Sequence, residues 1–320
     1  MAVYTEVSNL ELSAFIAEYD IGELVSCKGI AEGVENSNYL LTTGSGPYIL
    51  TLYEKRVCVE DLPFFLGLME HFAKFGLPCP FPIRGRDGDA LRNLCKRPAA
   101  IISFLPGSSP ELPGLDHCSK VGATLASFHN VGTDFSMSRS NNLSINAWRL
   151  LLERSGKRAD EVYPGLTKDL SEQLNSLENL WPVGLPVGII HADMFPDNVF
   201  FQRGRVSGVI DFYFACTDAF AYDIAICINA WCFEPDFSFN IAKARRMLEA
   251  YQKVRELDGN EIDAFPILAQ GAAMRFLLTR LYDWLNTSAE ALVTCKDPME
   301  LHAKLRFHTR VSDARAYGLD

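Results

Sequence analysis

The sequence predicts an α+β protein in two parts, a small strand-rich N-terminal part and a larger helical C-terminal part. Short runs rich in β-branched and aromatic residues fill much of the N-terminal third. A segment rich in proline and glycine, 106–114, then interrupts them. Beyond it, apolar residues recur mainly at helical spacing. We therefore divide the chain into a first lobe at 1–103 and a second lobe at 104–320.

The first lobe contains signals for both helices and strands. The expected elements are helix 8–20, strands 25–30, 38–42 and 48–53, helix 61–75 and strand 98–105. Ser8 precedes the first apolar run and suits an N-cap. Gly44 and Gly46 supply the turn between the second and third strands, while Gly76 and Pro78 end the second helix. The first lobe is therefore expected to be mainly sheet.

A strand and a hairpin interrupt the helical second lobe. The apolar run 187–190 suits a buried strand, and 199–201 and 206–212 are two further β-rich runs. Arg203-Gly204 supplies the turn that joins these two runs. The most apolar stretch, 224–233, is too short to span a bilayer, so we expect a buried helix there.

Bulk composition predicts a cytoplasmic protein that binds neither nucleic acid nor a membrane. Of the 320 residues, 48% are hydrophobic and 22% are charged, which is ordinary for a soluble globular chain. The formal net charge is −10 and no basic tract offsets it, which argues against a nucleic-acid partner. Nine cysteines without a CxxC pair indicate reduced thiols. The N-terminus lacks the basic start and apolar run of a signal peptide.

One segment, His191-Ala-Asp193-Met-Phe-Pro-Asp-Asn198 followed by Asp211, points to a specific chemistry. It has the spacing of a catalytic loop and metal-binding Asp for phosphoryl transfer, which implies ATP and Mg²⁺ as cofactors. Asp193 would orient an acceptor hydroxyl and take its proton. Asn198 and Asp211 would supply the oxygen ligands that Mg²⁺ prefers, brought together by the hairpin. His191 is a second candidate base, but we favour a role in holding the loop by hydrogen bonds.

Several further segments join this loop in carrying a family resemblance. The segments are 33–39, 48–54, 77–80, 191–198, 210–212 and 275–283. Through them the chain resembles the aminoglycoside and choline phosphotransferase branch of the protein-kinase-like folds, and within it is similar to the homoserine kinases. The resemblance implies a two-lobed protein-kinase-like fold. It also implies transfer of the ATP γ-phosphoryl group to L-homoserine in threonine biosynthesis.

The same resemblance implies where the nucleotide binds. The linker strand would meet the adenine edge through its backbone, and the turn after the first strand would cover the phosphates. The residues implied are Ser103, Phe104 and Leu105 at the adenine and Gly33, Asn36 and Ser37 at the phosphates.

Two departures from the general kinase pattern concern the phosphate contacts. The turn at 29–37 is not a G-x-G-x-x-G loop and has bulky residues between its glycines, which leaves fewer N–H groups for phosphate. Thr51 occupies the position where related kinases have a phosphate-contacting Lys, and Phe65 the position of the matching helix Glu. Heavier reliance on Mg²⁺ is one possible replacement. The other candidates are Lys28, Lys55 and Arg56.

The amino-acid end of the substrate needs a cation and an anion, because homoserine is a zwitterion. Arg280 and Asp283 lie three residues apart on one expected helix and share a face. A simple ion pair within that helix is the alternative interpretation. Asp223 is a third substrate candidate, although it could instead cap a helix start or, as the resemblance implies, steady the catalytic loop. Asp218 is expected to cap the helix start.

Other acceptors and another class of protein stay open at this point. Trp231, Phe233, Tyr282 and Trp284 could form a cage for a quaternary ammonium, although aromatics at helical spacing are more often core. Choline, ethanolamine and aminoglycosides are therefore alternative acceptors. The absent strand Lys also allows a non-catalytic kinase-like binding module. His129, at the end of an apolar helix, is expected to be a packed or capping residue.

Overall fold

A computed structural model describes residues 5–30, 36–54, 57–287 and 295–319. Its residue contacts divide the chain into two compact units. The first unit comprises Met1–Ser108, Phe200–Gln202 and Ser207–Tyr213. The second unit comprises Ser109–Val199, Arg203–Val206 and Phe214–Asp320. The first unit thus includes part of the hairpin that follows the catalytic loop, so a single cut in the sequence does not separate the units.

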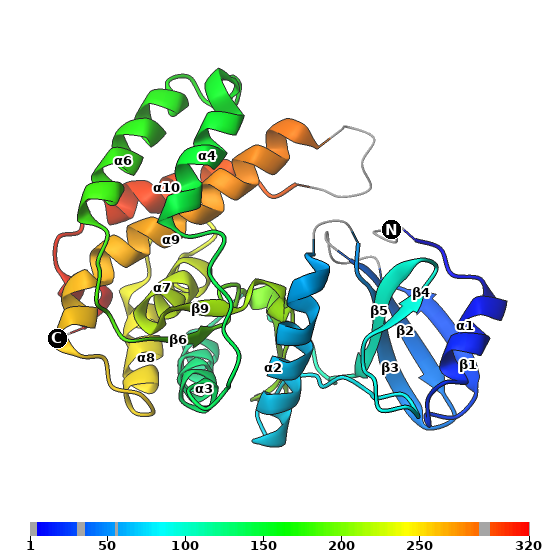
Figure 1. The fold of residues 1–320 in the computed structure, drawn as a ribbon. Helices are drawn as coiled ribbons and strands as arrows, with labels where there is room; N and C mark the ends of the chain where they lie inside the picture. Colours follow the sequence, from blue (N-terminus) through cyan, green and yellow to red (C-terminus); the bar gives the residue numbers. More distant parts are fainter. Residues whose placement is uncertain (1–4, 31–35, 55–56, 288–294, 320) are drawn as a thin grey trace. The chain divides into compact units, whose positions relative to one another are not determined.

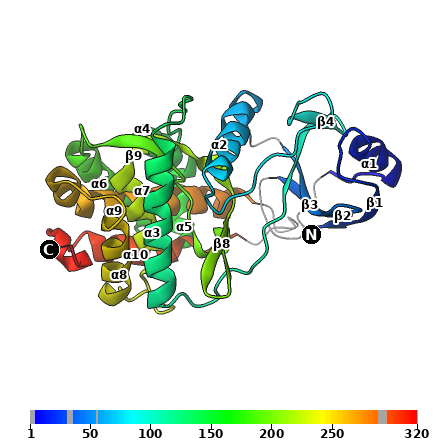
Figure 2. The ribbon, with the colours of Figure 1, turned by 90° about the horizontal axis from the view of Figure 1, so that it is seen from below.

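An antiparallel five-stranded sheet forms the framework of the first unit (Figures 1 and 2). Its strand order is β1-β2-β3-β5-β4. The strands are β1 (Leu24–Gly29), β2 (Ser37–Thr43), β3 (Gly46–Leu52), β4 (Arg92–Leu94) and β5 (Arg97–Ser103). The four strands expected from the sequence are therefore present. The three-residue β4 was not predicted, because Arg-Asn-Leu has no β pattern of its own.

Helix α1 (Asn9–Ile16) packs on this sheet and begins as predicted. The Ser8 side chain accepts a hydrogen bond from the Glu11 N–H, and the Glu11 side chain bonds the Ser8 N–H in return. Leu12, Phe15 and Ile16 share one core with sheet residues that include Leu41 and Leu50. Burial of this apolar face fixes the helix on the sheet.

Aromatic side chains attach the segment Ser207–Tyr213 to helix α2 (Leu62–Lys74), which follows the short 3₁₀ helix η1 (Val59–Asp61). The Tyr213 ring packs edge-on against Phe65 at 5.6 Å and against Tyr53 at 5.4 Å. The Tyr53 and Tyr213 hydroxyls lie 3.2 Å apart. Phe65, at the position of the kinase helix Glu, is thus part of a buried aromatic cluster.

The hairpin after the catalytic loop consists of β7 (Val199–Gln202) and β8 (Arg205–Val209). Arg203 and Gly204 form its turn with φ values of 51° and 72°, as a two-residue hairpin turn requires. The return strand ends at Val209, three residues earlier than predicted. Asp211 has a φ of 65°, and a left-handed residue cannot continue a strand. A 3₁₀ turn, η4 (Phe212–Phe214), follows it.

Helices dominate the second unit. They are α3 (Leu115–Gly132), α4 (Ile145–Ser155), α5 (Ala159–Val162), α6 (Leu166–Leu180), α7 (Phe220–Trp231), α8 (Ile241–Gln252), α9 (Gly259–Asn286) and α10 (Pro298–His308), with 3₁₀ helices η2 (Gly156–Arg158), η3 (Pro196–Asn198) and η5 (Ala314–Tyr317). The long helix α9 contacts α4, α6, α7 and α10, as Figure 1 shows. Helix α7 contains most of the apolar run 224–233 and is buried along nearly its whole length, as predicted.

A two-stranded antiparallel sheet lies among these helices and leads into the catalytic loop. It pairs β6 (Val187–Ile190) with β9 (Cys216–Ala219), so that Ile190 faces Cys216. The sequence did not predict β9, because Cys-Thr-Asp-Ala has no strand pattern. The expectation that Asp218 caps a helix was wrong: it lies in β9. Its carboxylate accepts from the Ala219 N–H and the Asn141 amide, both at 2.7 Å.

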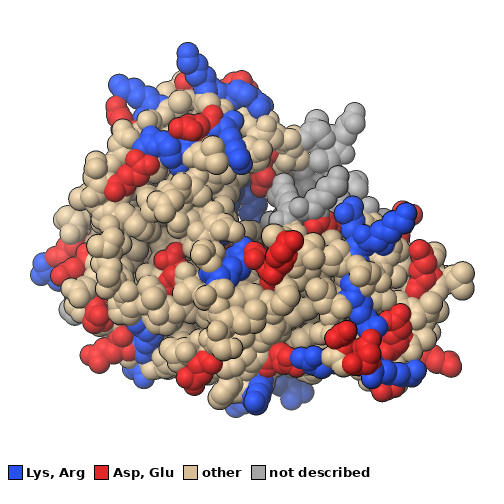
Figure 3. Space-filling view, viewed as in Figure 1, with Lys and Arg blue, Asp and Glu red and all other residues tan. Residues whose placement is uncertain are grey.

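Acidic and basic side chains are interspersed on the face drawn in Figure 3. Within the second unit, Arg149 of α4 pairs with Glu178 of α6. Among the described residues, no helix is both long and apolar enough to cross a membrane.

Candidate active site

The loop between β6 and β7 turns sharply at its second residue. Ala192 has a φ of 63°, a left-handed conformation that a non-glycine residue adopts at a cost. Neighbouring groups must therefore hold this conformation. His191 and Ala192 are buried, whereas Asp193 is only half-buried. The turn therefore leaves the Asp193 carboxylate accessible, although its two neighbours on the N-terminal side are buried.

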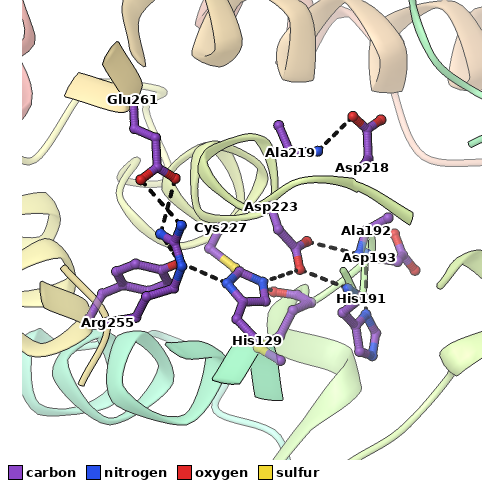
Figure 4. Close-up of polar contacts among 12 residues, drawn as sticks. His129, His191, Ala192, Asp193, Asp218, Ala219, Asp223, Cys227, Arg255 and Glu261 are labelled. Atoms are coloured by element: carbon purple, nitrogen blue, oxygen red, sulfur yellow. Dashed lines mark hydrogen bonds and ion pairs between the residues drawn. The ribbon is translucent and has the colours of Figure 1, made fainter. Parts of the chain in front are cut away.

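Asp223 of α7 binds the backbone of this turn (Figure 4). Its carboxylate accepts from the His191 N–H at 2.7 Å and from the Ala192 N–H at 2.8 Å. A third bond, of 3.0 Å, joins it to His129 Nε2. Burial alone would raise the pKa of this carboxyl, but the hydrogen bond from His129 and the contacts of His191 hold the pKa below its usual value. Asp223 is therefore an anion that fixes the loop.

Two further side chains bind carbonyl groups of the same loop. Arg275 of α9 donates to the Ala192 carbonyl, and its guanidinium lies 4.2 Å from the centre of the Phe276 ring. Trp231 of α7 donates through Nε1 to the Met194 carbonyl at 2.7 Å. Both side chains are almost fully buried. The loop backbone is thus held on its N–H side by Asp223 and on its carbonyl side by these two residues.

Asn198 directs its amide nitrogen toward Asp193. Nδ2 donates to the Asp193 carbonyl at 2.8 Å and to Asp193 Oδ2 at 3.0 Å. These two bonds fix the orientation of the amide, so its oxygen faces the other way. Within the described part of the chain that oxygen has no hydrogen-bond partner. A side-chain oxygen in this position fits a hard metal ligand.

His191 contacts the loop itself. The residue is 4% exposed, and its Nδ1 accepts a hydrogen bond from the Asp193 N–H at 3.2 Å. A general base must reach the proton that it removes. The burial of His191 therefore supports the favoured role of holding the loop rather than the alternative role as a base.

Asp211 belongs to the first unit, and Asn198 to the second. Within the first unit, Asp211 lies between the end of β8 and the aromatic anchors at 212 and 213. Phe212 packs against Phe72 of α2 with ring centres 5.9 Å apart. The position of Asp211 is thus set by packing against α2. A metal site that it shares with Asn198 remains a prediction.

The side chains expected at the nucleotide phosphates have partners within the first unit. Ser37 Oγ donates to Glu54 Oε1 at 2.8 Å, and Asn36 Oδ1 accepts from the Glu54 N–H at 3.3 Å. Thr51 is buried and donates to Asn38 Oδ1 at 2.8 Å. Gly33, Lys55 and Arg56 lie outside the described residues, and Lys28 is exposed on β1. The described contacts of Ser37 and Asn36 are therefore structural, and their binding of nucleotide stays a prediction.

The predicted adenine edge lies at the end of β5. The Ser103 N–H donates to the Phe81 carbonyl at 2.9 Å, so this donor is already used by the protein. Phe104 is exposed and Leu105 is half-buried, both beyond the last residue of the strand. The candidates that remain for the adenine contact are the backbone groups after the Ser103 N–H, those of Phe104 and Leu105 among them.

The three substrate candidates are placed differently. Arg280 of α9 forms an ion pair with Glu300 of α10 at 2.7 Å, and Asp283 follows one turn later on α9. Asp223 is fully buried with both oxygens bonded to the loop and His129, so direct contact with a substrate is closed to it. Trp231 is a core residue bonded to the Met194 carbonyl, as the favoured interpretation had it, and so cannot line an aromatic cage.

Comparison with known proteins identifies the class of enzyme. A model of the phosphotransferase enzyme family matches residues 26–257, and the chain therefore belongs to that family. An amicoumacin kinase in complex with AMP-PNP and Ca²⁺ has a TM-score of 0.69 over 96% of this chain and 95% of its own, with 13% identity. This likeness confirms the predicted kinase-like α+β fold.

Full-length relatives place the chain more narrowly. The homoserine kinase of Paramagnetospirillum magneticum is 60% identical over 326 residues and covers 100% of both chains. The homoserine kinase of Rhodospirillum rubrum is 59% identical over 319 residues, covering 100% of this chain and 99% of its own. Within the phosphotransferase family, the chain therefore groups with the homoserine kinases.

Sequence reasoning missed the residues that hold the loop from a distance. His129 was expected only to pack or cap, and Trp231 was weighed only as core or cage. Arg275 was noticed in the family segment 275–283, but not as a partner of the Ala192 carbonyl. A buried Arg or His in an otherwise apolar helix is a signal for such a role, because it must find polar partners inside the protein.

The bond pattern around Asp223 predicts the effect of its removal. Asp223→Asn is expected to lower the free energy of unfolding by about 1–3 kcal/mol, because an NH₂ group replaces one of two acceptor oxygens. The kcat of the enzyme should fall about tenfold as the loop loosens. Chemical unfolding and steady-state kinetics would measure both.

The lowered pKa of Asp223 also gives this prediction a pH dependence. The folded-state pKa lies below the unfolded one, so the ionised carboxylate stabilises the fold above the usual value of 3.8. That stabilisation is lost as the pH falls through the folded-state pKa. Asp223→Asn should therefore flatten the acid limb of the unfolding free energy, and an unchanged limb would contradict this assignment.

Proposed function

We propose that this chain is an ATP-dependent homoserine kinase. It transfers the γ-phosphoryl group of MgATP to the side-chain hydroxyl of L-homoserine, and acts in threonine biosynthesis in the cytoplasm. The main structural support is the half-buried Asp193, which is bonded to the Asn198 amide. It lies on a loop whose N–H groups and carbonyl groups are both held by buried side chains. The full-length similarity to homoserine kinases supports the choice of acceptor.

In the proposed reaction, Asp193 orients the homoserine hydroxyl and accepts its proton. The hydroxyl oxygen forms a bond to the γ-phosphorus as the bond to the ADP oxygen breaks. Such a transition state needs positioning and charge stabilisation more than covalent chemistry. Asn198 and Asp211 would hold magnesium, which when bound neutralises charge on the phosphate oxygens.

We assign residues to the adenine of ATP and to the charged groups of homoserine by chemical complementarity. Backbone groups at the end of β5, Phe104 and Leu105 among them, would bond the adenine. Arg280 and Asp283 would meet the carboxylate and ammonium of homoserine, with Arg280 shared between the substrate and its present partner Glu300. Arg280 keeps a small exposed fraction, 11% of its side chain, through which it could be reached.

A comparison of acceptors tests this function. ADP release would be measured with L-homoserine, L-serine, L-threonine, choline, ethanolamine and an aminoglycoside, each with and without magnesium. We expect kcat/KM for homoserine to exceed that for serine by at least about tenfold, since the acceptors differ by one methylene. Faster turnover of choline or an aminoglycoside would move the enzyme to another acceptor class. Magnesium-dependent turnover of none of them would indicate a binding module.

A further inference from the structure

A continuous network of polar side chains, all buried except the half-buried Arg255, connects the catalytic loop to the start of α9 (Figure 4). From Asp223 it passes to His129 of α3 at 3.0 Å, and from His129 Nδ1 to the Tyr251 hydroxyl of α8 at 2.7 Å. The Tyr251 oxygen then accepts from Arg255 Nη1 at 3.2 Å. Arg255 forms an ion pair with Glu261 at 3.0 Å. These bonds link α3, α8 and the start of α9 to the catalytic loop through Asp223.

The hydrogen bonds of this network can run in only one direction. Asp223 is ionised, so His129 Nε2 must be the donor. Burial lowers the pKa of His129 and keeps the ring neutral, so Nδ1 must accept the proton of Tyr251. Tyr251 has no second proton, and its oxygen is free to accept from Arg255. A carboxylate at one end and a guanidinium at the other thus fix every donor.

Helix α9 is connected to the catalytic loop in two ways, directly through one side chain and indirectly through the network. Arg275, near its middle, donates to the Ala192 carbonyl. Glu261, in its first turn, closes the capping box with Asp258 and also holds Arg255. Glu261 is 1% exposed, and such a buried carboxylate requires a charged partner. Glu261 therefore both caps α9 and holds the far end of the network that leads to the catalytic loop.

We propose that Tyr251, Arg255 and Glu261 are positioning residues for phosphoryl transfer. They fix the His129 ring, which fixes the Asp223 carboxylate, which in turn sets the turn at Ala192 and the direction of Asp193. The inference rests on the proposed kinase activity. It predicts that a defect at Tyr251 lowers kcat and leaves substrate binding intact, because the orientation of Asp193 matters only as the hydroxyl reacts.

A second buried His–Tyr pair in the protein resembles His129–Tyr251 but is not connected to the catalytic loop. His308 Nδ1 bonds the Tyr317 hydroxyl at 2.7 Å, and His308 Nε2 bonds Asn229 Oδ1 at 3.0 Å. Both rings are fully buried, as are His129 and Tyr251. The described side-chain partners of Asn229 are His308 and the carbonyls of Ala225 and Ala269, none of them on the catalytic loop. Tyr317 therefore makes the same bond as Tyr251 without the connection to Asp193.

The experiment compares Tyr251→Phe with Tyr317→Phe. Each variant loses one buried Tyr–His hydrogen bond, so both should shift the urea unfolding midpoint downward. Tyr251→Phe also removes the acceptor of Arg255 Nη1, so its shift should be at least as large as that of Tyr317→Phe. Only Tyr251→Phe should lower kcat with L-homoserine, by about tenfold, with both KM values within about twofold of wild type. Tyr317→Phe should keep kcat within about twofold of wild type.

Two results would overturn the inference: wild-type kcat in Tyr251→Phe, or equal losses of kcat in both variants. If Tyr251→Phe does not fold, Glu261→Gln decides, because glutamine keeps the helix cap but removes the charge paired with Arg255. A kcat about threefold lower is expected there, and an unchanged kcat would refute the role. Absence of homoserine turnover in the wild type would instead refute the proposed function itself.

Discussion

Replacing Asp193 with alanine is expected to lower kcat by about a thousandfold while MgATP still binds. A positioned general base contributes roughly 10²–10⁴ to such a reaction, and Asp193 would also orient the hydroxyl. The loop should keep its shape in the variant, because Asp223, Arg275 and Trp231 bind its backbone rather than this side chain. Steady-state ADP release would measure kcat, and titration with a non-hydrolysable ATP analogue would measure nucleotide affinity.

Asp197 offers a control on the same loop. Its carboxylate is 57% exposed and pairs with Lys296 at 2.7 Å, a surface ion pair worth about 0–1 kcal/mol. Asp197→Ala should therefore keep kcat within about threefold of wild type. Retention of more than a tenth of wild-type kcat by Asp193→Ala would remove this residue as the base. An equal loss in Asp197→Ala would show that the loop tolerates no change of charge.

The parts of the fold that the sequence predicted well have local causes. The turn at Arg203-Gly204 adopts the two positive φ values of a tight hairpin, and Gly is the residue that does so at no cost. Ser8 caps α1 through Glu11, three residues later in the chain. The catalytic loop is likewise specified by residues within eight positions. Such signals are readable because every group involved is close in sequence.

The parts that were missed depend on partners distant in sequence. His129 reaches Asp223 across 94 residues. Asp223 itself binds the loop 31 and 32 residues away, a role that the resemblance implied but that no local pattern indicated. No periodicity in one segment reveals such pairing. The strand β9 illustrates the same limit, because its four residues form a strand only where β6 provides the partner.

The nucleotide side of the prediction shows a different limit. The resemblance placed Asn36 and Ser37 at the phosphates, but both side chains face Glu54 inside the first unit. Glu54 in turn pairs with Arg97 at 3.2 Å. A family pattern identifies which residues surround a site, whereas the direction of each side chain depends on competing partners within the fold.

Replacing Asp211 with alanine is expected to reduce kcat/KM for MgATP by at least about a hundredfold. In the proposed site, its carboxylate supplies negative charge to the metal, worth several kcal/mol when a phosphoryl group is polarised. Unlike Asp193→Ala, this variant should weaken the binding of MgATP as well as turnover. Raising the magnesium concentration should recover part of the activity, because the remaining ligands still attract the ion.

The backbone at Asp211 makes asparagine the sharper replacement. With a φ of 65°, the residue occupies a conformation that Asp and Asn tolerate and Ala disfavours. Asp211→Asn therefore changes the charge without adding backbone strain, and should still lose MgATP affinity and kcat/KM. Backbone strain should lower the melting temperature of Asp211→Ala but not that of Asp211→Asn, while the Phe212 and Tyr213 anchors remain in both. Comparing the two melting temperatures therefore separates strain from the loss of charge. Unchanged MgATP affinity in Asp211→Asn would rule out a metal ligand here, because the formal charge is the one property that this substitution removes.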